Sequence, residues 1–199
     1  MNTEAERALG AIARAGLERC AAKLSRLSGA KWEVAGSAVK ASTMAEISSA
    51  FGQAAEGGAA VFLEAAGEEP FSSMAVFRPE DIEVISRGFL GFSFSKLPVL
   101  SQAQELLLSE LGNILLNSFL GALSNAVGRS YLPAVPKCVQ GEAGFLAEAL
   151  QATLDAGRPY AAALLTLELA CDGLNTKIEL IAAVPEGLEK ALVAAARGE

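Results

Sequence analysis

Hydrophobic residues recur every three to four positions over two long stretches of the chain. The first runs from about Glu4 to Ser28, with Thr3 and Glu6 spaced as a capping box at its start and Gly29 directly after it. The second runs from about Gln102 to Val127 and is also followed by a glycine. Two long amphipathic helices are therefore predicted.

Shorter apolar runs, bounded by turn residues, follow each long helix and predict strands. The predicted strands are Lys31–Ala41, Ala59–Ala66, Phe71–Phe77, Tyr131–Val139, Tyr160–Ala170 and Lys177–Val184. Between and after them, shorter helices are predicted from Thr43 to about Ala54, from Pro79 to about Arg87, over Ala143–Leu154, and onward from Pro185. A connection, Gly88–Pro98, separates the two series.

The two series repeat one another. Leu24-Ser25 returns 99 residues later as Leu123-Ser124, and Pro79-Glu80 returns 106 residues later as Pro185-Glu186. The order of elements is α-β-α-β-β-α in both. We therefore predict an α+β fold: two pseudo-two-fold related units forming one six-stranded, mainly antiparallel sheet flanked by two long helices. The chain is expected to be a single domain with sub-halves of about 1–97 and 98–199.

Composition narrows the possible functions. Of 199 residues, 52% are hydrophobic and 20% charged, which excludes a disordered chain. A net charge of −7 argues against nucleic acid as a partner, because a phosphate backbone is bound by basic surfaces. The N-terminal region lacks an uninterrupted apolar run, and polar residues interrupt the stretch Leu111–Gly128. We expect a cytoplasmic protein without membrane insertion.

The chain contains no histidine, which excludes Ser-His-Asp and Cys-His catalysis and removes the commonest zinc ligand. Cys20, Cys138 and Cys171 are far apart and odd in number, so neither a disulfide framework nor a metal site is predicted. We expect the protein to need no metal or cofactor of its own.

One face of the second long helix carries an unusual set of polar residues. At 100° per residue, Glu110, Asn113 and Asn117 share a narrow sector with Leu106. A solvated helix surface explains most such faces. The equivalent positions of the first helix hold Ala11 and Arg14, and Arg14 is spaced to pair with Glu18. If this face is a site, only the second half has it.

Several motifs together resemble the CheC and CheX family of chemotaxis phosphatases. They are Glu110-Leu-Gly-Asn113-Ile with Ser118 and Ala122-Leu123-Ser124, Pro136 with twenty-two residues between it and Asn113, Phe77-Arg-Pro79-Glu80-Asp81, and Val184-Pro185-Glu186. With the internal duplication, the resemblance covers nearly the whole chain and is closer to CheC. One position departs from the pattern, because the family usually has Asp or Ser four residues before the glutamate and Leu106 stands there.

The resemblance implies hydrolysis of the aspartyl-phosphate of a CheY-type response regulator. Asn113 would orient the attacking water, and Glu110 would pair with the regulator's active-site lysine. The required magnesium ion would belong to the regulator. We expect Asn117 to extend the site or form its rim, and Pro136 to end or bend a strand. The alternative is a non-catalytic adaptor that binds a CheD-type deamidase or a flagellar-switch component and uses Glu110 only for docking.

Overall fold

The computed structural model describes residues 1–52, 58–91 and 100–198. The helices are α1 (Thr3–Ser28), α2 (Met44–Gly52), α3 (Pro79–Leu90), α4 (Gln102–Val127), α5 (Ala143–Ala152) and α6 (Glu186–Arg197). The strands are β1 (Trp32–Ser42), β2 (Gly58–Ala66), β3 (Phe71–Phe77), β4 (Leu132–Pro133), β5 (Lys137–Gly141), β6 (Tyr160–Cys171) and β7 (Leu174–Pro185).

All strands join one antiparallel sheet in the order β1-β6-β7-β3-β2-β4, and β5 also pairs with β2. This order is symmetric. The equivalent strands β3 and β7 form the centre, β2 and β6 flank them, and β1 and β4–β5 lie outermost. Each half therefore places its outer strand beside the other half's hairpin, and the α+β, pseudo-two-fold prediction is confirmed.

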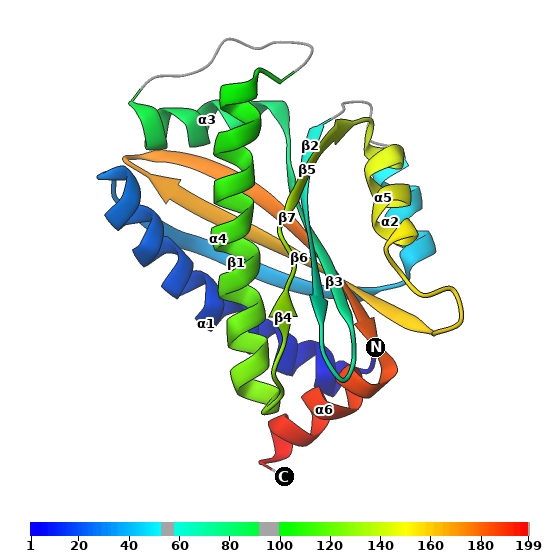
Figure 1. Ribbon diagram of the computed structural model, residues 1–199. Helices are drawn as coiled ribbons and strands as arrows, with labels where there is room; N and C mark the ends of the chain where they lie inside the picture. Colours follow the sequence, from blue (N-terminus) through cyan, green and yellow to red (C-terminus); the bar gives the residue numbers. More distant parts are fainter. Residues whose placement is uncertain (53–57, 92–99, 199) are drawn as a thin grey trace.

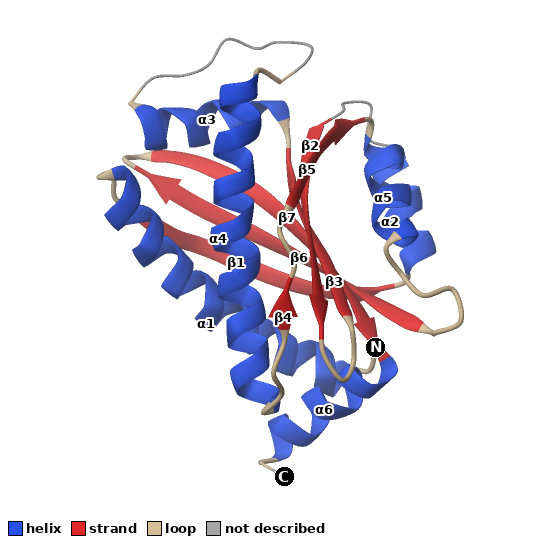
Figure 2. Ribbon diagram, viewed as in Figure 1, coloured by secondary structure: helices blue, strands red, loops and turns tan. Residues whose placement is uncertain are grey.

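Two layers of helices cover the sheet (Figures 1 and 2). The helices α1 and α4 lie side by side on one face, and α2 and α5 lie together on the other. Alternate residues of β2 divide between the two layers, because successive side chains of a strand point to opposite faces. Val61 and Leu63 are buried in the core that contains α1 and α4, whereas Ala60 and Phe62 are buried with α2 and α5.

The predicted strand Tyr131–Val139 is not continuous. It is divided into β4 and β5, and residues 134–136 between them are in neither strand. Pro136 directly precedes β5, where its missing N–H breaks the pairing, and the Ala134 N–H donates to the Glu64 carbonyl at 2.8 Å instead. This division is why the sheet has seven strands rather than six.

Several predicted helix ends differ from the structure. The N-cap of α1 is Asn2, whose carboxamide oxygen accepts from the Ala5 N–H at 2.8 Å, so the Thr3–Glu6 capping box is wrong. Glu6 is engaged elsewhere, because its carboxylate accepts from the Ala41 N–H of β1 at 3.0 Å. Pro185 still belongs to β7 and is the N-cap of α6 rather than its first residue.

The predicted start of α2 agrees with the structure, and the predicted end of α3 differs by three residues. Thr43 and Glu46 form the expected reciprocal capping contacts of α2, at 3.1 and 2.8 Å. The expected end of this helix near Ala54 lies outside the described residues. The helix α3 continues to Leu90, past the predicted end at Arg87, and most of the Gly88–Pro98 connection also lies outside the described residues.

Candidate active face of helix α4

The helix α4 is held at both ends by local contacts. Ser101 and Gln104 form a capping box, in which the Ser101 hydroxyl accepts from the Gln104 N–H at 3.3 Å and the Gln104 side chain accepts from the Ser101 N–H at 2.8 Å. At the other end Gly128 adopts φ 64°, a left-handed conformation that closes the helix. The predicted bounds Gln102–Val127 are confirmed without a change.

The buried side of α4 fixes the direction of its exposed side. Leu108, Leu111, Leu115 and Phe119 are at most 1% exposed. Gly112, inside the Glu110–Asn113 motif, lies against β2, and a β-carbon there would be 2.5 Å from the β-carbon of Val61. The helix therefore lies directly on the sheet, and the opposite sector of α4 faces outward.

The predicted stripe lies on this outward sector. Glu110 is exposed, Asn113 and Asn117 are half-buried, and Leu106 is 64% exposed. The structure thus brings all four residues to one accessible face. A carboxylate and a carboxamide one helical turn apart can contact two points of a docked surface at once.

The two carboxamides of the stripe contact each other. The Asn117 amino group donates to the Asn113 side-chain oxygen at 2.5 Å and to the Asn113 carbonyl at 3.0 Å. Sequence reasoning missed this contact, although the i,i+4 spacing of two amide side chains was a signal for it.

The helix α1 presents a different set of groups at the equivalent positions. Ala11 stands in place of Glu110. Arg14 and Glu18 stand in place of Asn113 and Asn117 and form an ion pair at 3.3 Å, with side chains 72% and 60% exposed. This pair matches the spacing predicted from the sequence, and α1 carries neither the carboxylate nor the carboxamide of the α4 motif.

The segment after α4 lies beside the helix and contributes groups that sequence reasoning did not single out. Strand β5 contacts α4, and Cys138 of β5 packs against the core below it. Burial raises the pKa of the Cys138 thiol to about 11, so the thiol stays protonated at neutral pH. Leu132 of β4 and Val135, which lies between β4 and β5, are 75% and 84% exposed. The half-buried Pro136 is not one of the exposed groups on the stripe.

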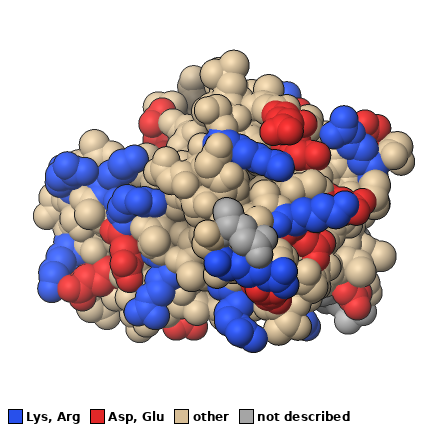
Figure 3. Space-filling view, turned by 90° about the horizontal axis from the view of Figure 1, so that it is seen from below, with Lys and Arg blue, Asp and Glu red and all other residues tan. Residues whose placement is uncertain are grey.

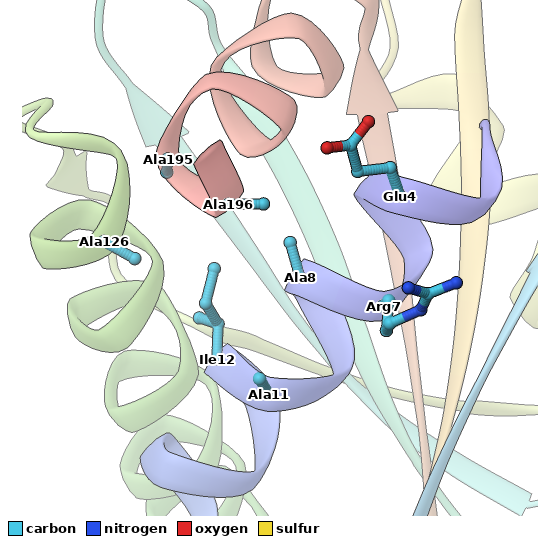
Figure 4. A pocket seen from close by; sticks show the side chains of 8 residues that line it. All are labelled: Glu4, Arg7, Ala8, Ala11, Ile12, Ala126, Ala195 and Ala196. Atoms are coloured by element: carbon cyan, nitrogen blue, oxygen red, sulfur yellow. The ribbon is translucent and has the colours of Figure 1, made fainter. Parts of the chain in front are cut away.

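A groove of about 590 Å³ lies between α1, α4 and α6 (Figure 4). Its lining is mostly alanine, with Glu4, Arg7 and Ile12 at its sides. On α4 it reaches Ala126, sixteen residues beyond Glu110, or about 24 Å along the helix. The groove is therefore separate from the stripe. Acidic and basic side chains are interspersed on the face seen from below (Figure 3). Beside the groove, Arg197 of α6 pairs with Glu4 of α1 at 2.8 Å.

The described residues contain no group of three His, Cys, Asp or Glu side chains that could hold a metal ion. All three cysteines are free, and burial raises the pKa of Cys20 to about 12.

Among the described helices, α4 alone is long and apolar enough to cross a membrane. However, 56% of its apolar window is buried inside the protein, against α1 and the sheet, as in the core helix of a folded domain.

Solved structures of similar fold cover nearly the whole chain. FliY from Thermotoga maritima has a TM-score of 0.79 at 17% identity, with 100% of this chain and 98% of that chain covered. A CheC-like superfamily protein from Shewanella sp. PV-4 has a TM-score of 0.54 at 16% identity, covering 92% and 99%. The CheX–CheY–BeF3–Mg2+ complex from Borrelia burgdorferi matches at 0.51 and 17% identity, covering 85% and 95%. The chain has the CheC/CheX-like fold.

This CheC/CheX-like fold confirms the resemblance found in the sequence. The FliG–FliM complex from Helicobacter pylori also matches, with a TM-score of 0.65 at 12% identity, covering 98% of this chain and 100% of that chain. No family model and no curated protein matches the sequence. The likeness is therefore one of fold, and the residues on α4 must carry any argument about activity.

Proposed function

We propose that this protein binds a phosphorylated CheY-type response regulator through the exposed face of α4 and hydrolyses its aspartyl-phosphate. The observation that carries the proposal is the pair Glu110 and Asn113, one turn apart on the accessible side of a helix whose other side is fixed to the sheet. The match to a CheX–CheY complex supports a CheY-type partner.

The chemistry suits a protein without histidine. An acyl phosphate is a high-energy mixed anhydride, and a response regulator holds it with its own metal ion and lysine. The second protein needs to supply only a positioned water. A carboxamide offers both a donor and an acceptor for this purpose, and we assign that role to Asn113. The carboxylate of Glu110 would pair with the regulator's lysine.

The proposed hydrolysis uses no metal ion bound to this chain. The magnesium ion would be bound by the regulator, beside the phosphoryl group. We further propose that the protein works in the cytoplasm, where it would meet its regulator.

A second candidate function is a non-catalytic adaptor of the flagellar switch. The match to the FliG–FliM complex favours it, and α1 shows that this fold can present a face without the carboxylate and carboxamide. In this case Glu110 would serve docking alone. None of the matched structures named above contains a CheD-type deamidase, and that partner stays a prediction.

The deciding experiment mixes the protein with phosphorylated CheY-type regulators in the presence of Mg2+ and follows phosphate loss over time. A phosphatase accelerates the loss in proportion to its concentration and turns over many regulator molecules. An adaptor binds, or fails to bind, without changing the regulator's own rate of phosphate loss.

A further inference from the structure

The hydrogen bond between the two asparagines fixes the orientation of the Asn113 amide. One lone pair of the Asn113 side-chain oxygen accepts from the Asn117 amino group at 2.5 Å. The same amino group donates to the Asn113 carbonyl at 3.0 Å. Because Asn117 makes both contacts from the next helical turn, its amino group cannot rotate without losing one of them.

This arrangement determines which groups Asn113 offers to a ligand. Its oxygen points toward Asn117 and keeps one free lone pair, and its own amino group is on the opposite side of the amide. The amino group donates no hydrogen bond within the described residues. A water molecule on the open face would therefore meet one acceptor and one donor in a fixed arrangement.

We infer that Asn117 is a positioning residue that holds the Asn113 amide in the orientation needed to bind the attacking water. This inference rests on the function proposed above. Asn117 acts through Asn113 and does not itself touch the regulator's phosphoryl group. Its contribution is preorganisation, since a side chain already held in one rotamer loses less freedom when the complex reacts.

The duplicated helix supplies an independent comparison. At the positions of Asn113 and Asn117, α1 also has an i,i+4 polar pair, but it consists of Arg14 and Glu18. There the second residue of the pair holds a cation rather than an amide. In both helices the second residue of the pair contacts the side chain of the first. The groups that the first residue offers to a ligand therefore depend on the second.

Two substitutions of Asn117 test whether the orientation of the Asn113 amide, and not only a contact with it, affects activity. In Asn117→Ala the Asn113 amide is unrestrained, and we expect kcat for regulator dephosphorylation to fall about tenfold with the KM unchanged. In Asn117→Asp the new carboxylate can only accept, so it would turn the Asn113 amide and take its amino group. We expect a further loss of several-fold in kcat. Asn125→Ala, also on α4 and exposed, is the matched control and should behave as the parent.

The outcomes distinguish this inference from the proposed function. If Asn113→Ala is inactive but both Asn117 variants keep the parental kcat, the positioning role is wrong and the proposed function stands. Equal kcat in Asn117→Ala and Asn117→Asp overturns the orientation argument. If the parent protein does not accelerate phosphate loss, the proposed function fails by itself.

A measurement without the regulator tests the contact directly. In side-chain amide NMR spectra of the free protein, Asn117→Asp should shift the Asn113 amino protons strongly, because they become donors to a carboxylate. Asn117→Ala should bring them toward the averaged values of an exposed asparagine. Unchanged Asn113 amide signals in both variants would overturn the inference whatever the activity.

Discussion

The helices α1 and α4 are the two copies of one element, and their exposed sides carry different groups. Each has 26 residues, begins and ends 99 positions from its counterpart, and closes on a left-handed glycine. Three leucines recur on their buried sides: Leu9, Leu17 and Leu24 of α1 stand in the places of Leu108, Leu116 and Leu123 of α4, and all six are at most 1% exposed.

Their exposed sides share a geometry but not a chemistry. Both carry a polar i,i+4 pair, an ion pair on α1 and two carboxamides on α4. Packing against the sheet restricts the buried side chains in size and polarity, whereas many different polar side chains are tolerated on the solvent-exposed side. The comparison teaches that this fold constrains one face of the helix and leaves the other free to gain or lose a site.

The largest effect is expected when the exposed residues of α4 are grafted onto α1. In an Asn113→Ala background, adding Ala11→Glu with Arg14→Asn and Glu18→Asn should raise dephosphorylation roughly tenfold over the background alone, because the full α4 set is rebuilt on α1. The same background with only the first two changes should gain much less, since Glu18 would turn the new amide. Regulator dephosphorylation rates measure both. No gain in a folded triple graft would show that more than the exposed residues separates the helices.

The close approach of the two helices gives the next largest effect. Gly16 of α1 lies against α4, and a β-carbon there would be 2.9 Å from the Ser118 carbonyl oxygen. Gly16→Ala should therefore lower the free energy of unfolding by about 1–3 kcal/mol.

Gly10 provides the control in the same helix, because a β-carbon there would meet nothing closer than 3.6 Å. Gly10→Ala should raise the free energy of unfolding by about 0.5–1 kcal/mol through helix propensity. Urea unfolding measures both variants. A Gly16→Ala protein as stable as the parent would contradict the tight contact between α1 and α4.

The smallest effect concerns docking. Glu110→Ala removes a carboxylate that α1 lacks, and the dissociation constant for the phosphorylated regulator should rise about fivefold at low salt, with a smaller change at high salt. Glu105→Ala changes the charge by the same amount on the exposed surface of the same helix, away from the stripe. Calorimetric titration of both variants with the phosphorylated regulator at two ionic strengths measures the two dissociation constants. Equal losses of affinity in the two variants would contradict a specific role of Glu110.

Much of the fold followed from periodicity, because the repeat of apolar positions in α1 and α4 fixed both their bounds and their buried sides. The helix cap at Asn2 was missed because Asn2 and Thr3 are adjacent and both can cap; the choice depends on Glu6 contacting a distant strand. Pro136 was expected to end or bend this strand, but the sequence did not show that pairing resumes directly after it as β5, because apolar residues continue through the segment.

The stripe on α4 was predictable for the same reason as the helix. Glu110, Asn113 and Asn117 share a sector in an α-helix, and the structure adds that this sector is accessible. The contact between the two asparagines depends on side-chain rotamers, which spacing alone does not determine. The exposed Leu132 and Val135 were likewise unpredictable, since an apolar run gives no sign of lying outside the core.

The most direct test of the central claim is the dephosphorylation rate of a phosphorylated CheY-type regulator with the parent protein, Asn113→Ala and Asn125→Ala, all at saturating regulator. Loss of a water-positioning group should lower kcat in Asn113→Ala on the order of 100-fold while regulator binding is kept. Asn125→Ala should match the parent. An Asn113→Ala protein that binds and dephosphorylates the regulator at the parental rate would contradict the assignment of the active face to α4.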